Sequence, residues 1–493
     1  MTEYIKTISR EVFGLFLTLD KRFSSIPKTC EYILSEFISD LSANINFSKS
    51  NPSSIEYFNE LELPINTSLN SSLIQIHTSE TVNIIIKSIL ATKKPDEIAS
   101  IVAKLQFKFL NTSVFTPKFH KNPFSILAKK RIYIGSIGSS RIDKIILFLS
   151  FFRKLRRISL KEVNLTNSIN IDRKELIKKI LLLDEDIEKQ QIMSLVILLA
   201  PSILIEHVQF LFDYDTHNYV PITKRDIIIS SNIFQYCEIL IALREKYQYY
   251  NIILQHGIGY KEIKGDIRFS LEQLISDKWI SWDSNLIPNP KIKVLRSSNP
   301  FYTTLIYPRH HKFQGRDIMS LKIEELEATD DLFIKSINEI KSMKDRKLNI
   351  RMLTDSGWHT PLIDIINDTH TNNCSFEKVI DKSSVIICIS YSTALIESIL
   401  SEVPTIWLCP SQFEALLQGY LLDLHRYMKE RNTVLSENSN IMKLRLLLNP
   451  KNQEQLKMSH QENRNFLKSK LNIYKTNKFI RGLKAQSNSH IYQ

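Results

Sequence analysis

Glycine is scarce in this chain, and long apolar runs are absent. Only 10 of the 493 residues are glycine, whereas about 7% is average. The longest apolar stretch, Ile192–Ile205, is shorter than the roughly 20 residues that cross a bilayer, and it contains Pro201. The first residues, MTEYIKTISREVF, include acidic side chains and no long apolar segment. We therefore expect neither a signal peptide nor a transmembrane helix.

Cysteine motifs that hold metals are also missing. The five cysteines follow no CxxC spacing and no spacing with histidine that is typical of a metal site. Cys388 and Cys409 lie in apolar runs, where cysteine usually acts as a small core residue. These features predict a protein of the reducing cytoplasm.

The chain is strongly basic, with a formal net charge of +13. Nucleic acid, anionic lipid and phosphorylated substrates all suit such a charge. A basic nucleic-acid-binding protein without enzymatic activity is therefore one candidate class. Its only support is charge, because the sequence shows no basic platform with interleaved aromatics, no helix-turn-helix and no zinc motif. We expect no nucleic-acid partner.

Apolar strands alternate with helices from residue 131 onward. The pattern predicts strands in "RIYIGSIG" (131–138), "DIIISSNIF" (226–234), "YYNIILQHG" (249–257) and "DKWISWD" (277–283), with a helix over 234–247. After residue 290 it predicts strands in "KIKVLRSS", "TTLIYPR", "NIRMLTD", "SVIICIS" and "VPTIWLC", with helices over 331–343, 376–382 and 393–401. Such alternation is typical of parallel sheets covered on both faces. We predict an α/β protein with two Rossmann-like, doubly wound domains.

Changes in this pattern divide the chain into four parts. Residues 1–125 combine helical stretches with Asn- and Ser-rich connections, and we expect them to belong to or elaborate the first domain. Residues 126–290 form the first Rossmann-like domain and residues 291–450 the second. Residues 451–493 form a basic helical tail.

Three of the ten glycines lie in the single stretch NIILQHGIGYKEIKGD, residues 251–266. Gln255, His256 and Gly257 come at the end of a predicted strand, and parallel sheets bind ligands outside the carboxyl ends of their strands. Glycine lets the backbone turn sharply and approach a ligand. His256 can donate to an anion or transfer a proton near neutral pH. A tight turn whose histidine caps the next helix has about equal support from position alone.

Hydroxyl groups gather in "SVIICISYSTALIESIL", residues 384–400. Ser390, Ser392 and Thr393 fall between a predicted strand and the start of a helix, where hydroxyls, free N–H groups and the helix dipole form an anion site. Glu397 lies about one turn further on, where a carboxylate can hold ribose hydroxyls. Serine is also a common N-cap, but capping explains only one of the hydroxyls.

A third group of polar residues follows the predicted strand in "TTLIYPRHH", residues 303–311. Arg309 and His310 come directly after Pro308. Arginine is always charged and matches the geometry of phosphate. A solvated basic loop is an equally supported alternative for this stretch alone.

Together the motifs resemble those of a known group of enzymes. "PSILIEHVQFLF", "ILQHGIGY", "ISDKWISWDS", "LIYPR" and "SYSTALIESILSEVPTI" stand, over residues 201–410, in the order seen in bacterial transferases from O-antigen and other surface-polysaccharide loci. The QHG turn and the Ser/Thr–Glu helix also resemble capsule and polysialic-acid glycosyltransferases. Those enzymes have the GT-B fold, in which the acceptor binds the first of two Rossmann-like domains and the activated sugar binds the second.

In GT-B transferases that use CMP-activated ulosonic acids, a Pro-containing basic motif and a Ser/Thr motif hold the CMP phosphate, and "YPRHH" and "SYST" resemble these two motifs. This chain departs from them at Tyr307, where they usually have histidine, and at Ile258, where a second glycine is usual.

The resemblance implies a glycosyltransferase that moves an ulosonic acid such as Kdo, or a sialic-acid-like sugar, from a CMP donor onto a surface-glycan or lipid-linked acceptor. The candidate acid–base groups are His256, Glu206 and Asp277. The candidate nucleotide-sugar ligands are Arg309, His310, Ser390, Ser392, Thr393 and Glu397, and the substrate loop comprises Gln255, Gly257, Gly259 and Tyr260. We expect no cofactor and no metal, since fixed donors can stabilise the leaving phosphate. A glycerol- or ribitol-phosphate transferase, or a sugar-nucleotide epimerase, is the alternative on this fold.

Two acidic triplets and one amphipathic stretch bear on metal and membrane binding. We expect Asp184–Asp186 to form a solvated face and Asp213–Asp215 a polar turn, with a cation site as the alternative for the second triplet. Residues 144–162 predict a basic amphipathic helix on an anionic membrane surface, and residues 468–484 a second basic patch. The competing interpretation of the helix is packing on a sheet, as for most amphipathic helices.

Overall fold

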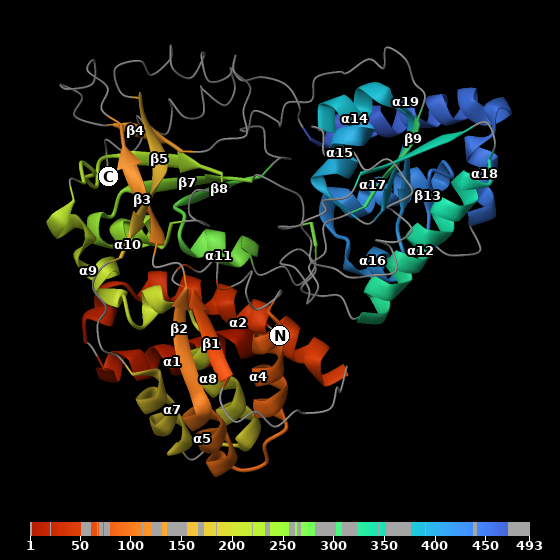
Figure 1. Cartoon of the computed structure of the whole chain (residues 1–493). Coiled ribbons are helices and arrows are strands. Elements are labelled where there is room, and N and C mark those ends of the chain that lie inside the picture. Colours follow the sequence, from red (N-terminus) through yellow and green to blue (C-terminus); the bar gives the residue numbers. More distant parts are fainter. Residues whose placement is uncertain are drawn as a thin grey trace.

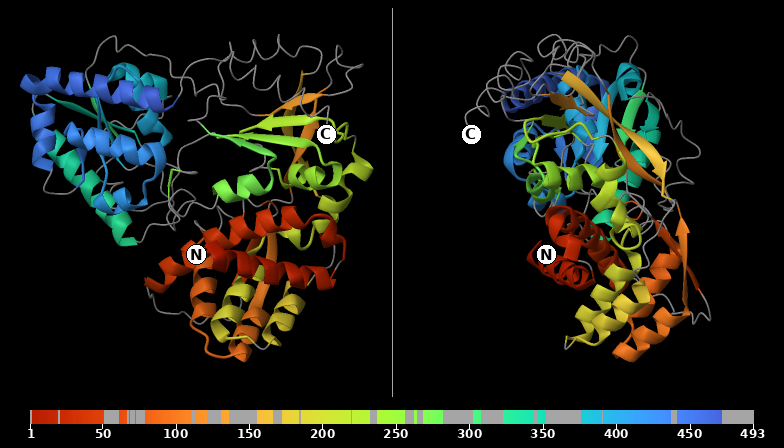
Figure 2. Two further views of the ribbon diagram at one scale, coloured as in Figure 1. Left: turned by 180° about the vertical axis from the view of Figure 1, so that it is seen from behind. Right: turned by 90° about the vertical axis from the view of Figure 1, so that its left-hand side faces the viewer.

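The structure is a computed structural model of the whole chain. It describes residues 2–19, 21–50, 61–66, 68, 72, 79–110, 113–120, 131–135, 155–165, 172–183, 185–218, 220–231, 237–255, 262–263, 268–281, 302–307, 323–343, 346–351, 376–389, 391–436 and 441–471. Two α/β domains lie side by side, and a helical body adjoins the first of them (Figures 1 and 2).

The helical body combines the start of the chain with a later segment. It contains α1 (Thr2–Leu19), η1 (Lys21–Ser25), α2 (Pro27–Ser50), α4 (Glu80–Leu90), α5 (Pro95–Lys104), α7 (Arg173–Leu181) and α8 (Ile187–Leu199), with a parallel pair of strands, β1 (Leu61–Asn66) and β2 (Leu105–Leu110). Helices α7 and α8 contact each other and also pack on α5 and α4. Segments more than 60 residues apart in the sequence therefore share one core.

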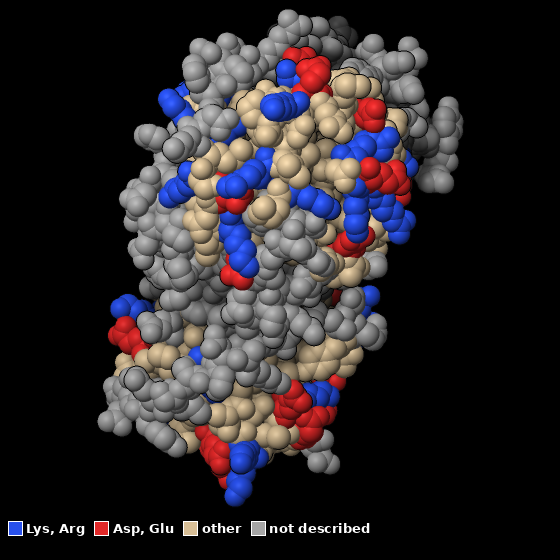
Figure 3. Space-filling view, turned by 90° about the vertical axis from the view of Figure 1, so that its right-hand side faces the viewer, with Lys and Arg blue, Asp and Glu red and all other residues tan. Residues whose placement is uncertain are grey.

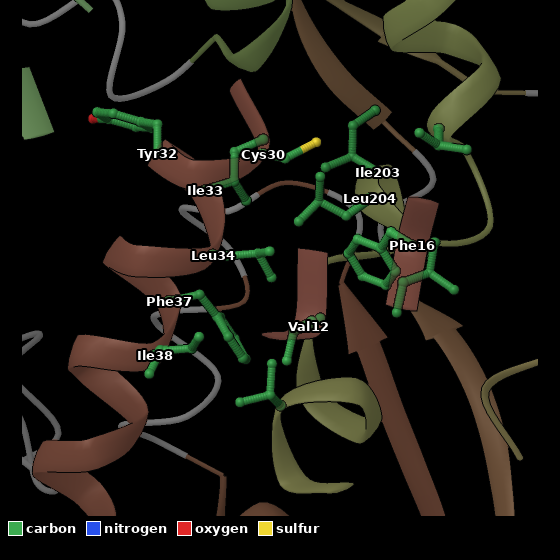
Figure 4. Packing of buried hydrophobic residues seen from close by; sticks show 14 of the residues in the cluster. Val12, Phe16, Cys30, Tyr32, Ile33, Leu34, Phe37, Ile38, Ile203 and Leu204 are labelled. Carbon is green, nitrogen blue, oxygen red and sulfur yellow. The ribbon is translucent and has the colours of Figure 1, made fainter. Parts of the chain in front are cut away.

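Buried apolar side chains join the helices of this body. Val12 and Phe16 of α1 face Leu34 and Phe37 of α2 (Figure 4), and all four are at most 1% exposed. The start of α2 is fixed by a distant carboxylate, because Glu245 accepts hydrogen bonds from the backbone N–H groups of Lys28 and Thr29, each at 2.7 Å. This contact satisfies two N–H groups that have no partner inside the helix.

The first domain is built on a six-stranded sheet in the order β3-β5-β4-β6-β7-β8. Its strands are β3 (Ser113–Phe119), β4 (Ile132–Ile134), β5 (Leu155–Asn164), β6 (Ile227–Ser230), β7 (Tyr250–Leu254) and β8 (Lys278–Ile280); its helices are η3 (Ser202–Leu204), α9 (Val208–His217), α10 (Glu238–Tyr247) and α11 (Arg268–Leu274). Only β3 is antiparallel to its neighbour. The predicted strand–helix–strand unit is confirmed as β6-α10-β7.

The second domain has a five-stranded, fully parallel sheet in the order β10-β9-β11-β12-β13. Its strands are β9 (Tyr302–Ile306), β10 (Lys347–Arg351), β11 (Ser383–Ile389), β12 (Thr405–Leu408) and β13 (Val434–Leu435); its helices are α12 (Ile323–Lys341), α14 (Phe376–Lys382), α15 (Thr393–Leu400), α16 (Ser411–Leu416), α17 (Gly419–Glu430), α18 (Ile441–Leu448), η6 (Pro450–Asn452) and α19 (Gln453–Lys470). The predicted strand in "KIKVLRSS" lies outside the described residues.

Alternate side chains of these strands enter two separate cores. Cys388 and Trp407 pack with residues of α15, α17 and α19, whereas Ile387 and Ile406 pack with residues of α12 and α18. The period of two is what a strand imposes on a sheet with both faces covered. Cys388 and Cys409 are fully buried, which confirms their interpretation as core residues.

The basic amphipathic helix predicted over 144–162 is wrong in its second half. Leu155–Asn164 form β5, which pairs with β3 and β4, and residues 144–154 lie outside the described residues. Pairing with two strands overrides the helical spacing of the apolar residues. Arg156 lies over the ring of Tyr133 at 5.9 Å. Among the described helices, none has the length and apolar character needed to span a bilayer.

Candidate active site

The strand order of the second domain creates a switch point between β9 and β11. The chain runs from β9 outward to β10 and then returns to the other side of β9 as β11. The connections that follow β9 and β11 therefore diverge, and ligands of open α/β sheets bind in the resulting crevice. Ile306 pairs with Cys388 in the register, so these two strands leave the sheet side by side.

Two of the polar sequence motifs follow these two strands. Tyr307 ends the described part of the first motif; Arg309 and His310 follow it in the chain and lie outside the described residues. Ser392 and Thr393 come three and four residues after the end of β11. The topology therefore brings Tyr307, the last described residue of the first motif, and Ser392 of the second motif to one switch point, although they lie about 85 residues apart in the sequence.

Ser392 is the N-cap of α15. Its backbone is extended, and its hydroxyl oxygen accepts a hydrogen bond from the N–H of Leu395 at 3.2 Å. A serine hydroxyl that accepts one bond keeps its own O–H to donate. The partly exposed side chains of Ser392, Thr393 and Glu397 lie on the first turns of this helix, where the dipole favours an anion. Ser390 lies outside the described residues.

Gln255 lies at the carboxyl end of β7 in the first domain. Its backbone N–H donates to the carbonyl of Ile280 at 2.9 Å, which extends the pairing of β7 with β8. Its side-chain amide donates to the carboxylate of Glu262, at 3.1 and 3.3 Å from the two oxygens. Both side chains are buried, with 3% and 1% exposed. His256, Gly257, Gly259 and Tyr260 lie outside the described residues.

The chain after this loop crosses to the second domain. The carbonyl oxygen of Glu262 accepts a hydrogen bond from the N–H of Gln418 at 2.9 Å, and Ile263 forms an antiparallel bridge with Leu417. Leu417 follows α16, which itself follows the carboxyl end of β12. Glu262 and Ile263, six and seven residues after the predicted catalytic histidine, therefore lie where connections from the carboxyl ends of both sheets meet.

Glu206 lies in a buried ion pair, where its two oxygens accept from Nε and Nη2 of Arg173 at 2.6 and 2.7 Å. The same guanidinium donates from Nη1 to the carbonyl of Ile197 at 2.6 Å. Both side chains are at most 9% exposed. These contacts are those of a structural ion pair between α7 and the segment before α9, and a catalytic role for Glu206 stays a prediction.

Asp277 lies at the amino edge of the first sheet, because it directly precedes β8. Its carboxylate accepts from the N–H of Asn251 at 2.7 Å and from Arg244 at 3.0 Å. Asn251 is four residues before Gln255, which corresponds to about 13 Å along a strand. The structure therefore does not bring Asp277 to the edge where Gln255 lies, and its contacts give no support to a catalytic role.

The two acidic triplets have structural contacts. Asp186 is the N-cap of α8, and Glu185 pairs with Lys189. Asp215 lies within α9, so the expected polar turn is wrong, and it accepts from Lys246 at 2.7 Å and from Tyr247. Burial acts to raise the pKa of Asp215, but these hydrogen bonds together lower it. The described residues contain no cluster of three side chains able to hold a metal ion.

Sequence reasoning missed two features of the site. One is Glu262, which lies between two lysines in "YKEIKGD" and therefore looks like part of a solvated segment. The other is the switch point of the first sheet, which lies between β4 and β6. There Gly135 donates to the carbonyl of Ile229 at 2.9 Å. Ser230 and Ser231, both buried, come at the end of β6.

The chain matches one family model and distantly resembles several solved structures. No curated protein matches the chain. The solved structures that it resembles include TarM (11% identity, 54% of this chain and 55% of that chain, TM-score 0.34) and the spinosyn forosaminyltransferase SpnP (8% identity, 73% and 100%, TM-score 0.34). A third is a UDP-N-acetylglucosamine 2-epimerase from Listeria monocytogenes (10% identity, 73% and 97%, TM-score 0.38).

The match to TarM thus spans about half of each chain. TM-scores this low do not establish a shared fold. The strand orders of the two sheets confirm two doubly wound domains. The family comparison is of a different kind, because it covers most of the chain. The model described as "LIC12162 family transferase" matches residues 21–425. The chain belongs to the LIC12162 family of transferases.

Proposed function

We propose that this transferase is a glycosyltransferase that takes its sugar from a nucleotide donor held by the second domain. The observation that supports the proposal is that Tyr307, directly after β9, and the Ser392–Glu397 segment, after β11, lie at the same switch point, and Arg309 and His310 follow Tyr307 in the sequence. An arginine, hydroxyls and a helix N-terminus at one crevice suit the phosphate of a nucleotide.

The leaving nucleotide gains negative charge as the bond to the sugar breaks. Donors fixed in advance, namely the O–H of Ser392, the first N–H groups of α15 and the guanidinium of Arg309, would stabilise that charge. Glu397, one turn along α15, would accept from ribose hydroxyls. In the first domain, His256 would take the proton of the acceptor hydroxyl. The acceptor would bind near the switch point between β4 and β6.

The donor that we propose first is a CMP-linked ulosonic acid, on the strength of the YPRHH and SYST motifs, and the acceptor is a surface glycan or its lipid-linked precursor. A glycerol- or ribitol-phosphate transferase and a sugar-nucleotide epimerase remain alternatives that a donor screen separates. The face shown in Figure 3 adds no support to a nucleic-acid binder, because Lys and Arg are interspersed there with Asp and Glu. Binding to an anionic membrane stays a prediction.

Thermal shift with CMP, CDP, UDP and GDP tests the proposal. A ligand at about 100 times its Kd adds about 2.7 kcal/mol of stability, so at least one nucleotide should raise Tm. Absence of any shift at millimolar concentrations would contradict it. The variant Ser392→Asp separates capping from anion binding, because aspartate caps a helix as well as serine does and repels phosphate. We expect it to fold normally and to lose the nucleotide shift.

Two matched variants control this experiment. Ser392→Asn also preserves the cap but is neutral, so it should keep part of the shift. Ser469→Ala removes an exposed hydroxyl on α19 that donates only locally, to the carbonyl of Phe466, and should keep all of it. An unchanged nucleotide shift in Ser392→Asp would show that Ser392 is an N-cap and no more.

A further inference from the structure

Glu262 contacts the first domain through its side chain and the second domain through its backbone. Its side chain accepts from the amide of Gln255, at the end of β7 in the first domain. Its carbonyl oxygen accepts from the N–H of Gln418 in the second domain, at 2.9 Å. A glutamate is almost never fully buried unless it is paired, and this one is 1% exposed. A glutamate in a solvated loop would keep its carboxylate in water and would need no such partner.

The residue after it enters the core of the second domain. Ile263 is 3% exposed and belongs to the same buried cluster as Leu417, Phe413 and Tyr391. The ring of Tyr391 meets the ring of Phe413 edge-on at 6.0 Å between centroids. Tyr391 directly precedes Ser392, the cap of α15. Packed side chains thus run from Ile263 to the edge of the nucleotide motif.

We propose that Glu262 is a positioning residue that holds Gln255, at the end of β7, to the nucleotide-binding domain, so that a nucleotide bound at α15 restrains this end of the strand. This inference rests on the proposed function of the β9–β11 switch point. Glu262 does not touch the reacting atoms; it acts through Gln255 on one side and through the Ile263–Leu417 bridge on the other. A contiguous set of contacts makes coupling possible, and coupling itself has to be measured.

Hydrogen exchange followed by mass spectrometry measures this coupling between the domains. The experiment does not require the identity of the donor sugar. The probe is CMP, with CDP, UDP and GDP in parallel. In the wild-type chain we expect the nucleotide to slow exchange both at 391–397, in its own domain, and at 250–255, in the other. We expect the second effect to be about tenfold, which corresponds to about 1.4 kcal/mol. In Glu262→Ala, 391–397 should remain protected while the protection of 250–255 disappears.

A matched control comes from the same domain. Glu272 is also a buried carboxylate, 3% exposed, and accepts from Nε1 of Trp279 at 2.6 Å. Glu272→Ala should lower stability and leave the cross-domain protection intact. Glu262→Gln keeps an oxygen acceptor for Gln255 and should restore most of the protection. If Glu262→Ala does not fold, Ile263→Ala breaks the same link from the other side and should give the same loss.

The outcomes separate the positioning role of Glu262 from the proposed nucleotide-binding function. Equal protection of 250–255 in the wild type, Glu262→Ala and Ile263→Ala would overturn the positioning role. Loss of this protection in Glu272→Ala as well would also overturn it, because the effect would then be one of general stability. If no nucleotide protects 391–397 even in the wild type, the proposed function fails. The link is then decided by exchange at 417–422 without nucleotide, which Glu262→Ala should accelerate and Glu272→Ala should not.

Discussion

In the first domain the parallel strands run in the order β5-β4-β6-β7-β8, and in the second in the order β10-β9-β11-β12-β13. Both orders place the second strand of the sequence outside the first. The covering of the two sheets differs. Described helices pack on both faces of the second sheet. On one face of the first sheet, the buried cluster of described residues comes from strands alone, with Ile229, Ile252 and Ile280 among them.

The polar contacts of the two domains also differ. Buried charges occur in and beside the first domain: Arg173 of the helical body pairs with Glu206 of the first domain, and Arg131 pairs at the amino edge of the first sheet with Asp226, whose side chain is fully buried. The ion pairs of the second domain include partly exposed ones such as Lys429–Glu414, which contribute little. The regular second domain therefore depends on apolar packing, whereas the elaborated first domain also depends on a few buried charges.

The largest effect on stability should come from breaking the buried ion pair between the helical body and the first domain. Arg173→Leu leaves the carboxylate of Glu206 buried without its partner, which typically costs about 3–5 kcal/mol. Urea unfolding measures the loss. The double variant Arg173→Leu/Glu206→Leu should recover much of it, since an ion pair replaced by apolar residues is often neutral. A single variant as stable as the wild type would refute the contrast between the domains, and a double variant with full activity would remove Glu206 from the catalytic candidates.

A second prediction separates chemistry from nucleotide binding. His256→Ala should lower the transfer rate by about 100-fold or more, because one acid–base group is lost. It should leave Tm and the nucleotide-induced rise in Tm unchanged, because the proposed nucleotide site lies in the other domain. Turnover with a saturating donor and thermal shift measure the two effects. Near-normal turnover would show that the histidine only shapes a turn.

The smallest effect concerns the pH dependence of the second domain. His460 is 3% exposed, and its Nε2 donates to the carbonyl of Ser401 at 3.1 Å. Burial lowers the pKa of His460 to about 4, whereas an unfolded histidine titrates near 6.5. Between these two values the unfolded state binds more protons, so stability falls as the pH falls, by at most about 1.4 kcal/mol per pH unit.

The variant His460→Gln tests this dependence, because its amide can donate to the same carbonyl but does not titrate. The unfolding free energy of the wild type should approach that of the variant as the pH is lowered from 7 to 6 and then to 5. A wild-type pH slope equal to that of the variant would contradict the assignment.

The accuracy of the sequence-based prediction in each region depends on how the strands of that region are covered. Strands such as "SVIICIS" and "VPTIWLC" are buried on both faces, so their apolar runs are continuous and their boundaries were predicted closely. Residues 155–162 are predicted as part of a helix because the apolar residues up to Leu155 have helical spacing beside a basic cluster, whereas pairing with β3 and β4 makes them a strand. The switch-point motifs were recognised from residue types, whereas the edge on which Asp277 lies depends on strand register.

Glu262 and Arg173 were out of reach for a different reason. Each becomes significant only through a partner that the chain brings close in three dimensions: Gln418 lies about 150 residues from Glu262, and Glu206 lies 33 residues from Arg173. Charged residues in polar segments are normally solvated. Local sequence therefore favours the wrong environment for both.

The cap that Glu245 places on α2 also constrains the order in which the chain can fold during synthesis. The contact spans 217 residues, and a ribosome that adds about 5–20 residues per second needs roughly ten to forty seconds to produce them. The N-terminal helices leave the ribosome early but cannot complete their contacts until α7, α8 and α10 exist. A fragment that ends at residue 165 should therefore show weak exchange protection in α2. We also expect the full chain to need chaperones that prevent aggregation during synthesis.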